Sequence, residues 1–274
     1  MDTIDSKNQI SLSEKKLIML EMMDEIDYFC SKHNLTYFLI GGTLLGAIRH
    51  NGYIPWDDDI DIGLPRNDYN KLIKTFASLS GNIEIIKADN FHRYRWPNAK
   101  AIHTKTKLVE LDNEKTAIGV FIDIFPIDGI CGNYKYIKKK VIQKTFWQNL
   151  LALKYLKIDR HRSKMKNFVV IVCKTLKIIP DKWLIKMINS TEKKSVPFSD
   201  CEYICNFCGA WGIREITKAS NFLQTIDANF EGRIYKIPIG YDDYLRTVYG
   251  NYMELPPAEK RVTHHQSKSY WRKQ

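Results

Sequence analysis

The sequence lacks any apolar run long enough to cross a membrane. A spanning helix needs roughly 18 or more apolar residues in succession, and the best stretch, residues 168–179, is interrupted by Lys174 and Lys177. The first residues also lack the basic start and apolar run that are typical of a secretion signal. We therefore expect a cytoplasmic protein.

Cysteines are few and mostly scattered. Of the six, only Cys201, Cys205 and Cys208 form a cluster. In a cytosolic protein we expect reduced thiols rather than disulfides. Three cysteines leave a tetrahedral zinc site one ligand short, so a structural Zn²⁺ at this cluster would need Cys131 or a histidine as well. Free thiols are the alternative that we favour.

Low-complexity and strongly biased segments are also absent, which excludes collagen-like and extensively disordered chains. The chain has 274 residues, of which 44% are hydrophobic and 27% charged. This length and composition are ample for a buried core in a globular protein.

Positive charge is concentrated in one segment. The formal net charge is +11, and residues 135–186 carry fifteen Lys or Arg against two Asp. Solvated helix faces would explain such a run. The sharper hypothesis is a surface for an anionic partner, such as membrane headgroups, a phosphorylated glycan carrier or nucleic acid. We prefer peripheral contact with the inner face of an anionic membrane, because no nucleic-acid recognition motif accompanies the charge.

Hydrophobic spacing predicts an α+β fold. A capping box of Ser11 and Glu14 begins a helix that ends near residues 33–34. Further helices are predicted at 43–50, 65–80 and 239–249. Strands are predicted at 37–40, 58–64, 83–86, 96–103, 108–111, 120–125 and 233–237. Pro126 is expected to end the strand 120–125. We divide the chain into a catalytic core (1–130), a basic helical appendage (131–198) and a C-terminal segment that packs back on the core (199–274).

Four aspartates gather within residues 57–61. Side chains alternate along a strand, so Asp57, Asp59 and Asp61 would share one face and Asp58 would point to the other. Carboxylates this close repel one another, and a divalent cation relieves the repulsion. Mg²⁺ prefers carboxylate oxygens together with substrate phosphates. The pattern therefore predicts a metal-dependent phosphotransferase that uses Mg²⁺ (or Mn²⁺).

A glycine turn precedes this cluster. Gly41, Gly42 and Thr43 follow a short apolar strand and open a predicted helix. Such a turn presents backbone N–H groups and a helix N-terminus to a phosphate, and glycine permits close approach. We predict that this turn binds a phosphate.

A third carboxylate is expected from a neighbouring strand. Asp123 lies in the otherwise apolar segment 121–125, and a buried lone charge needs a partner or a metal. We prefer Asp123 as a site residue over Asp128, which follows Pro126 and could cap a turn. A structural ion pair is the alternative for Asp123.

The block LIGGTLLGAIRHNGYIPWDDDIDI, residues 39–62, resembles the LicD family of phosphocholine transferases. That family belongs to the nucleotidyltransferase superfamily and is related to fukutin and the fukutin-related protein. Segments 121–128 and 249–265 are also similar to it. The resemblance implies a nucleotidyltransferase-like mixed sheet flanked by helices, with a helical appendage.

The resemblance also implies a reaction. A phosphoryl-alcohol group, most simply phosphocholine from CDP-choline, passes to a sugar hydroxyl of a bacterial surface glycan (lipopolysaccharide, teichoic acid or capsule) and CMP is released. The partners are then a nucleoside-diphosphate-alcohol donor and a glycan acceptor, which could be lipid-linked. Metal at Asp59, Asp61 and Asp123 would bridge the donor phosphates. Asp57 would be a further ligand, or the base for the hydroxyl proton.

Four more residues enter through the same resemblance. Arg49 and Lys100 fall where the family has polar residues, and each could neutralise phosphate or form an ion pair. His264 and His265 lie in a proline-rich tail that could fold back onto the site. The resemblance leaves open whether choline, glycerol or ribitol is transferred.

Two other functions are open. A nucleotidyltransferase that moves NMP onto a sugar or another small acceptor would use the same carboxylates. A nucleic-acid-binding protein would use residues 135–186 instead.

Overall fold

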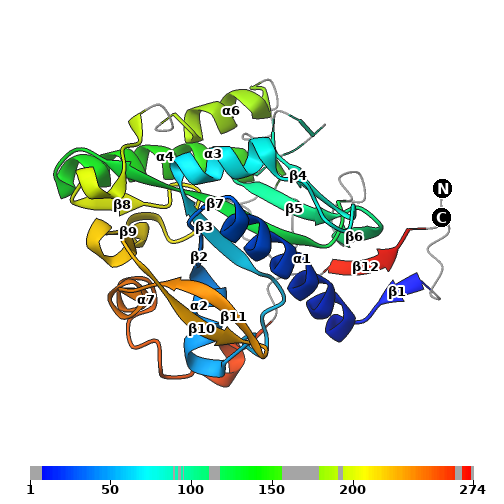
Figure 1. Ribbon diagram of the computed structural model, residues 1–274. Helices are drawn as coiled ribbons and strands as arrows, with labels where there is room; N and C mark the ends of the chain where they lie inside the picture. Colours follow the sequence, from blue (N-terminus) through cyan, green and yellow to red (C-terminus); the bar gives the residue numbers. More distant parts are fainter. Residues whose placement is uncertain are drawn as a thin grey trace.

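The computed structural model describes residues 8–88, 90–91, 94, 96–110, 118–155, 179–190, 194–262 and 267–272. A mixed β-sheet runs through the centre, with helices around it (Figure 1). The predicted α+β architecture, a mixed sheet flanked by helices, is confirmed.

Five strands form the main path of the sheet. β3 and β7 pair in parallel at its centre, and the other neighbouring pairs are antiparallel. The order is β2 (Phe38–Leu39), β3 (Asp61–Pro65), β7 (Phe121–Ile130), β5 (Ala99–His103) and β4 (Ile83–Ile86). Two further strands, β8 (Tyr203–Cys205) and β9 (Ile216–Lys218), extend it from the far end of β7.

Pro126 does not end its strand, contrary to the prediction. β7 continues to Ile130 and changes partners on one side, pairing with β5 up to Ile124 and with β8 from Asp128 onward. Pro126 lies in the gap between those two partners, where its missing N–H removes no ladder bond on that side. The longer strand carries Asp128 into the sheet.

Helix α1 (Leu12–Lys32) begins where the capping box predicted it. The Ser11 hydroxyl accepts a hydrogen bond from the Glu14 N–H at 3.2 Å. The helix buries an apolar stripe that includes Met19, Met23 and Ile26, and it packs against β5 and β7. α1 thereby covers one face of the sheet.

Three other helices frame the site. α2 (Gly41–His50) follows β2, α3 (Arg66–Thr75) follows β3, and α7 (Tyr241–Tyr249) packs against α2. α3 is shorter than predicted. After Thr75 the chain becomes extended, and the Glu25 carboxylate of α1 accepts hydrogen bonds from Ser78, Leu79 and Ser80.

The chain ends supply a second, small sheet that the sequence did not predict as a unit. β12 (Ser267–Trp271) lies between β1 (Gln9–Ile10) and β6 (Thr106–Glu110). A separate hairpin of β10 (Thr225–Phe230) and β11 (Arg233–Pro238) packs near β2 and α2. Short 3-10 turns complete the C-terminal part: η5 (Phe198–Asp200), η6 (Gly212–Glu215), η7 (Ala219–Phe222) and η8 (Ala258–Lys260).

The basic segment contains two described helices. α4 (Tyr134–Tyr155) and α6 (Asp181–Ile188) pack together through Leu151, Leu184 and Ile188. Its lysines do not all face solvent, because Lys144 and Lys154 are buried. The interval 156–178 lies outside the described residues.

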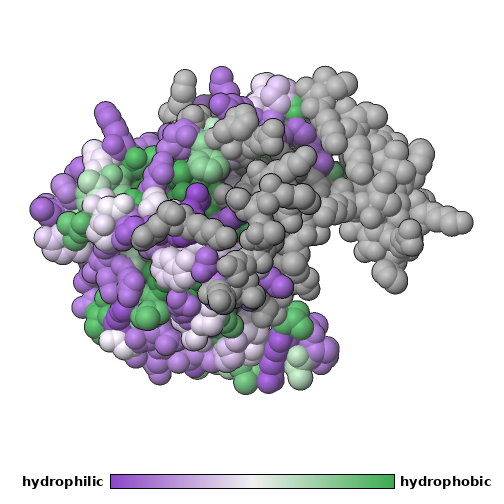
Figure 2. Space-filling view, turned by 90° about the vertical axis from the view of Figure 1, so that its right-hand side faces the viewer, coloured by the Kyte–Doolittle hydropathy of each residue, from purple (hydrophilic) through white to green (hydrophobic). Residues whose placement is uncertain are grey.

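Polar side chains dominate the visible surface. Figure 2 shows mainly hydrophilic residues among the coloured atoms of one face, with hydrophobic residues in small groups between them. Within the described ranges, none of the helices combines the length and the apolar character required to cross a bilayer.

Candidate active site

The glycine turn lies against the aspartates. Gly41 begins α2 with a φ of +57°, which favours glycine. A Cβ atom added to Gly41 would lie 3.1 Å from Asp61 Oδ2, and one added to Gly42 would lie 2.6 Å from Asp57 Oδ2. The N-terminus of α2 therefore meets carboxylates directly, and a side chain at Gly42 would displace one of them.

Thr43 holds the glycine turn against β3. Its buried hydroxyl accepts a hydrogen bond from the Asp61 N–H at 2.8 Å. This bond ties the first turn of α2 to the first residue of β3. It fixes Thr43 as a positioning group rather than an exposed phosphate ligand.

The acidic cluster is built from a turn and a strand, not from strand alone. The predicted strand starts three residues late, at Asp61, and Asp57 closes a turn by donating its N–H to Ile54 O at 2.8 Å. The side chains of Asp57 and Asp59 still lie close enough to interact electrostatically. Burial and the neighbouring Asp59 raise the pKa of Asp57 to about 7. Burial, together with the other carboxylates, also raises the pKa of Asp61 well above its usual range.

Asp123 lies behind Asp61, where the parallel register of β3 and β7 makes the two residues partners. The buried Lys100 Nζ is 2.6 Å from Asp123 Oδ1, and Asn98 Nδ2 donates to the same oxygen at 2.5 Å. Lys100 also lies over the ring of Phe121, 3.6 Å from its centroid. Lys100 and Asp123 therefore form an ion pair with each other, which is the alternative that the sequence analysis gave for each residue.

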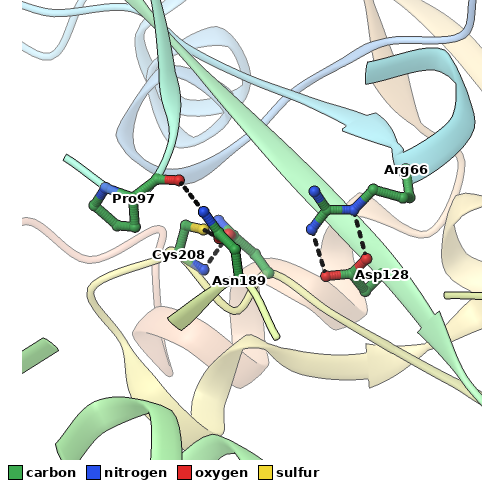
Figure 3. Close-up of polar contacts among 6 residues, drawn as sticks. Arg66, Pro97, Asp128, Asn189 and Cys208 are labelled. Carbon is green, nitrogen blue, oxygen red and sulfur yellow. Dashed lines mark hydrogen bonds and ion pairs between the residues drawn. The ribbon is translucent and has the colours of Figure 1, made fainter. Parts of the chain in front are cut away.

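Two other aspartates are held away from the cluster. Asp58 points away, as predicted, and pairs with Lys15 of α1 at 2.6 Å. Asp128 forms a two-pronged ion pair with Arg66 of α3, at 2.7 and 2.8 Å (Figure 3). Both oxygens of Asp128 are engaged in this ion pair, and the preference for Asp123 over Asp128 as a site residue stays a prediction.

A cleft of about 730 Å³ opens beside the acidic cluster. Six of the predicted site residues line it: Gly41, Gly42, Arg49, Asp57, Asp59 and Asp61. Thr43, Lys100 and Asp123 are buried behind this lining. His264 and His265 lie outside the described residues.

Arg49 holds one wall of the cleft in place. Its Nη1 donates to Tyr252 O at 2.6 Å and to Glu254 O at 3.2 Å. These bonds attach the segment after α7 to the C-terminal end of α2. Arg49 thus shapes the cleft through backbone contacts as well as lining it.

Other residues of the cleft lining were not singled out by the sequence analysis. Asn206, Gly209, Trp211, Glu215 and Tyr249 line the same cleft. More than 140 residues separate them from the acidic cluster, and no spacing pattern links them. Only Tyr249 had a local signal, the density of aromatic residues between 241 and 252.

The donor groups suit a hard divalent cation. Mg²⁺ is usually held by one or two carboxylates together with water and substrate phosphates, and Asp57, Asp59 and Asp61 offer closely spaced carboxylates at the cleft. Across the described residues, no three His, Cys, Asp or Glu side chains are arranged to hold a metal ion by themselves. A site of this kind would therefore be completed by the substrate.

The cysteine cluster is largely buried. Burial raises the pKa of Cys208 to about 11 and that of Cys205 above its usual range. Cys208 Sγ lies 3.5 Å from Asn189 Oδ1, and Asn189 in turn donates to Pro97 O (Figure 3). Zinc would have to displace the protons of these thiols on binding, and a structural Zn²⁺ at this cluster stays a prediction.

Several known proteins are similar in sequence to this chain. Residues 34–169 match the LicD/FKTN/FKRP nucleotidyltransferase domain. The lipopolysaccharide cholinephosphotransferase LicD of Haemophilus influenzae is 30% identical over 268 residues, which cover 96% of this chain and 98% of that protein. An uncharacterised protein of Rickettsia typhi is 39% identical over 27% of the chain and 25% of its own length. The ribitol 5-phosphate transferase FKRP of human is 40% identical over 17% of the chain and 10% of its own length.

The match with the Haemophilus protein runs the length of both chains, and the family domain spans the glycine turn, the acidic cluster and Asp123. The chain therefore belongs to the LicD family and is a transferase of phosphate-containing groups.

Proposed function

We propose that the chain transfers phosphocholine from CDP-choline to a sugar hydroxyl of a cell-surface glycan, with lipopolysaccharide as the first candidate, in a Mg²⁺-dependent reaction. The observation that carries this proposal is the contact of Gly41 and Gly42 with Asp57 and Asp61 at the cleft. Backbone N–H groups beside carboxylates are the groups that would bind a metal-bound diphosphate, and their proximity supports the proposal. The full-length likeness to a cholinephosphotransferase supports choline as the alcohol.

The reaction is a displacement at phosphorus. The acceptor hydroxyl oxygen attacks the phosphorus that carries choline, the bond to the bridging oxygen breaks, and CMP leaves. When bound, Mg²⁺ would neutralise the phosphate oxygens and the leaving group. Asp59 and Asp61 would hold it, with Asp123 behind them.

The chain's own groups have the remaining tasks. Gly41 and Gly42 let the donor phosphates approach the N-terminus of α2, and Thr43 keeps β3 and α2 in register. Two roles are open for Asp57: a further metal ligand, or the acceptor of the hydroxyl proton. A general base acts best with a pKa near the working pH.

Nucleotidyl transfer is the enzyme alternative, because the same carboxylates would serve it. The test is to incubate the protein with Mg²⁺, a glycan acceptor and either labelled CDP-choline or labelled nucleoside triphosphates. We expect CMP release and a phosphocholine-labelled glycan. Transfer of the nucleotide portion, without transfer of phosphocholine, would overturn the proposal.

Membrane proximity is part of the same proposal. The described lysines Lys135, Lys138 and Lys139 of α4 are exposed, and exposed cations attract anionic lipid. A lipid-linked acceptor would be presented at such a surface. The absence of a recognition motif for nucleic acid leaves the membrane as the favoured partner of this segment.

A further inference from the structure

The lining of the cleft also includes a buried carboxylate that no cation of the described residues neutralises. Glu215, the last residue of η6, is 3% exposed and lines the cleft. Its Oε1 accepts a long hydrogen bond of 3.4 Å from the Trp211 N–H, whereas its Oε2 has no hydrogen-bond partner among the described residues. Among the described residues no Lys or Arg forms an ion pair with it.

A buried carboxylate without a partner is costly to the fold. Burial raises the pKa of Glu215 to about 7. The chain nevertheless leaves room for this group, because a Cβ atom on Gly209 would lie 2.2 Å from Glu215 Oε1. Gly209 thus leaves space beside a carboxylate that has no cationic partner, which suggests that a ligand supplies the positive charge.

Aromatic rings stand beside this acid. Trp211 and Tyr249 pack edge to face, with ring centroids 5.0 Å apart, and both line the cleft. Trp211 remains 43% exposed, so much of its surface is available to a ligand.

Glu215 and the glycine turn, where we expect the donor phosphates, are linked through two tyrosines. Burial, and after it the charges of Glu215 and Asp61, raise the pKa values of Tyr244 and Tyr249. Tyr244 and Gly41 also line the same cleft. The two tyrosines therefore connect the buried acid with the glycine turn across one cleft.

We infer that Glu215, Trp211 and Tyr249 bind the quaternary ammonium group of the alcohol that is transferred. Aromatic faces attract cations that cannot donate hydrogen bonds, and the Glu215 carboxylate supplies the opposite charge. This inference rests on the proposed transfer of a phosphoryl-alcohol group, and it selects a cationic alcohol over a polyol such as glycerol or ribitol.

The test compares two donors that differ in one charge. CDP-choline and its neutral analogue, in which 3,3-dimethylbutanol replaces choline, have the same shape. We expect the wild-type protein to favour CDP-choline. Glu215→Gln should raise the KM for CDP-choline by about 10- to 30-fold, as for the loss of a desolvated cation contact, and should leave the KM for the neutral donor nearly unchanged.

Matched variants separate binding from folding. Trp211→Leu should weaken the same preference, whereas Trp183→Leu, which replaces a comparably exposed tryptophan on α6, should not. Glu84→Gln, at an exposed position of β4, is the control for Glu215→Gln. Thermal melts show whether each variant remains folded.

Several results would overturn the inference. One is a wild-type preference for the neutral donor or for a CDP-polyol. Another is an equal loss of kcat with both donors in Glu215→Gln, which would point to a general structural or chemical role. If no donor releases CMP, the proposed function fails, and equilibrium dialysis with labelled choline then decides the inference: retention by wild type and not by Glu215→Gln supports it, and no retention by wild type refutes it.

Discussion

Asp61 and Asp123 lie directly opposite each other on the parallel strands β3 and β7. Asp61 borders the cleft, and Asp123 stands behind it with Lys100 and Asn98 on its Oδ1. Oδ2 of Asp123 takes part in neither contact. The pair therefore offers one carboxylate at the cleft and a second that is already partly neutralised, which limits the repulsion between them.

Asp61→Asn should separate activity from stability. The raised pKa of Asp61 means that its charge opposes folding near neutral pH, so the neutral amide should leave the thermal midpoint equal or higher. Turnover should fall by at least about 100-fold if Asp61 holds the metal. The measurement is CMP release alongside a thermal melt. Asp227→Asn, at an exposed aspartate of β10, is the control, and near-normal turnover of Asp61→Asn would remove Asp61 from the site.

Lys100→Met should destabilise the fold, because it leaves the Asp123 carboxylate buried without its cation. Loss of one partner of a buried ion pair costs about 3–5 kcal/mol, measurable by urea unfolding. The double variant Lys100→Met/Asp123→Asn removes both charges and should recover most of this loss. A phosphate-binding role for Lys100 alone predicts instead a raised KM for the donor with little change in unfolding free energy.

Gly42→Ala tests the close contact between the turn and the cluster. The new Cβ would lie 2.6 Å from Asp57 Oδ2, so the carboxylate must move. We expect turnover to fall by about 10- to 100-fold, since small misplacements in a site are costly. Gly232→Ala is the contrasting variant, because its Cβ meets nothing within 4 Å although its φ is +76°. It should lose stability and keep its activity; equal activity of both variants would contradict the prediction.

Local features of the fold could be predicted, and contacts between distant segments could not. The Ser11 cap, the acidic cluster and the glycine turn are encoded within a few residues, and the structure has them. Pro126 misled the prediction because its effect depends on which strands flank β7. The role of Glu215 could not be predicted, since its burial and missing partner arise only when η6 packs beside α7.

The stability of the metal-free protein should decline as pH rises from about 4 to about 7. Asp57 and Glu215 each have a folded pKa raised to about 7, so the native state retains protons that the unfolded chain has already lost. Their stabilising contribution is therefore complete below the unfolded pKa values and is lost as pH passes the folded ones. Above about pH 7 their effect becomes constant.

Urea unfolding in EDTA at pH 5.5 and pH 8 measures this dependence. The difference between the two pH values should shrink in Asp57→Asn and in Glu215→Gln. Added Mg²⁺ should stabilise wild type more at pH 8, where the carboxylates are ionised and binding shifts the equilibrium. A wild-type pH difference that both variants retain would show that these two acids do not titrate as the structure indicates.

The exposed lysines of α4 predict binding to anionic membranes. Lys135, Lys138 and Lys139 are exposed, whereas Lys144 and Lys154 are buried and cannot contribute. Each basic residue near an anionic surface contributes about 1 kcal/mol, so replacing the three exposed lysines with glutamine should reduce partition by on the order of 100-fold. Flotation with phosphatidylserine-containing vesicles measures this, and replacing the exposed Lys105, Lys218 and Lys268 is the matched control. Equal flotation of wild type with neutral and anionic vesicles would refute membrane attachment through α4, because only electrostatic attraction distinguishes those surfaces.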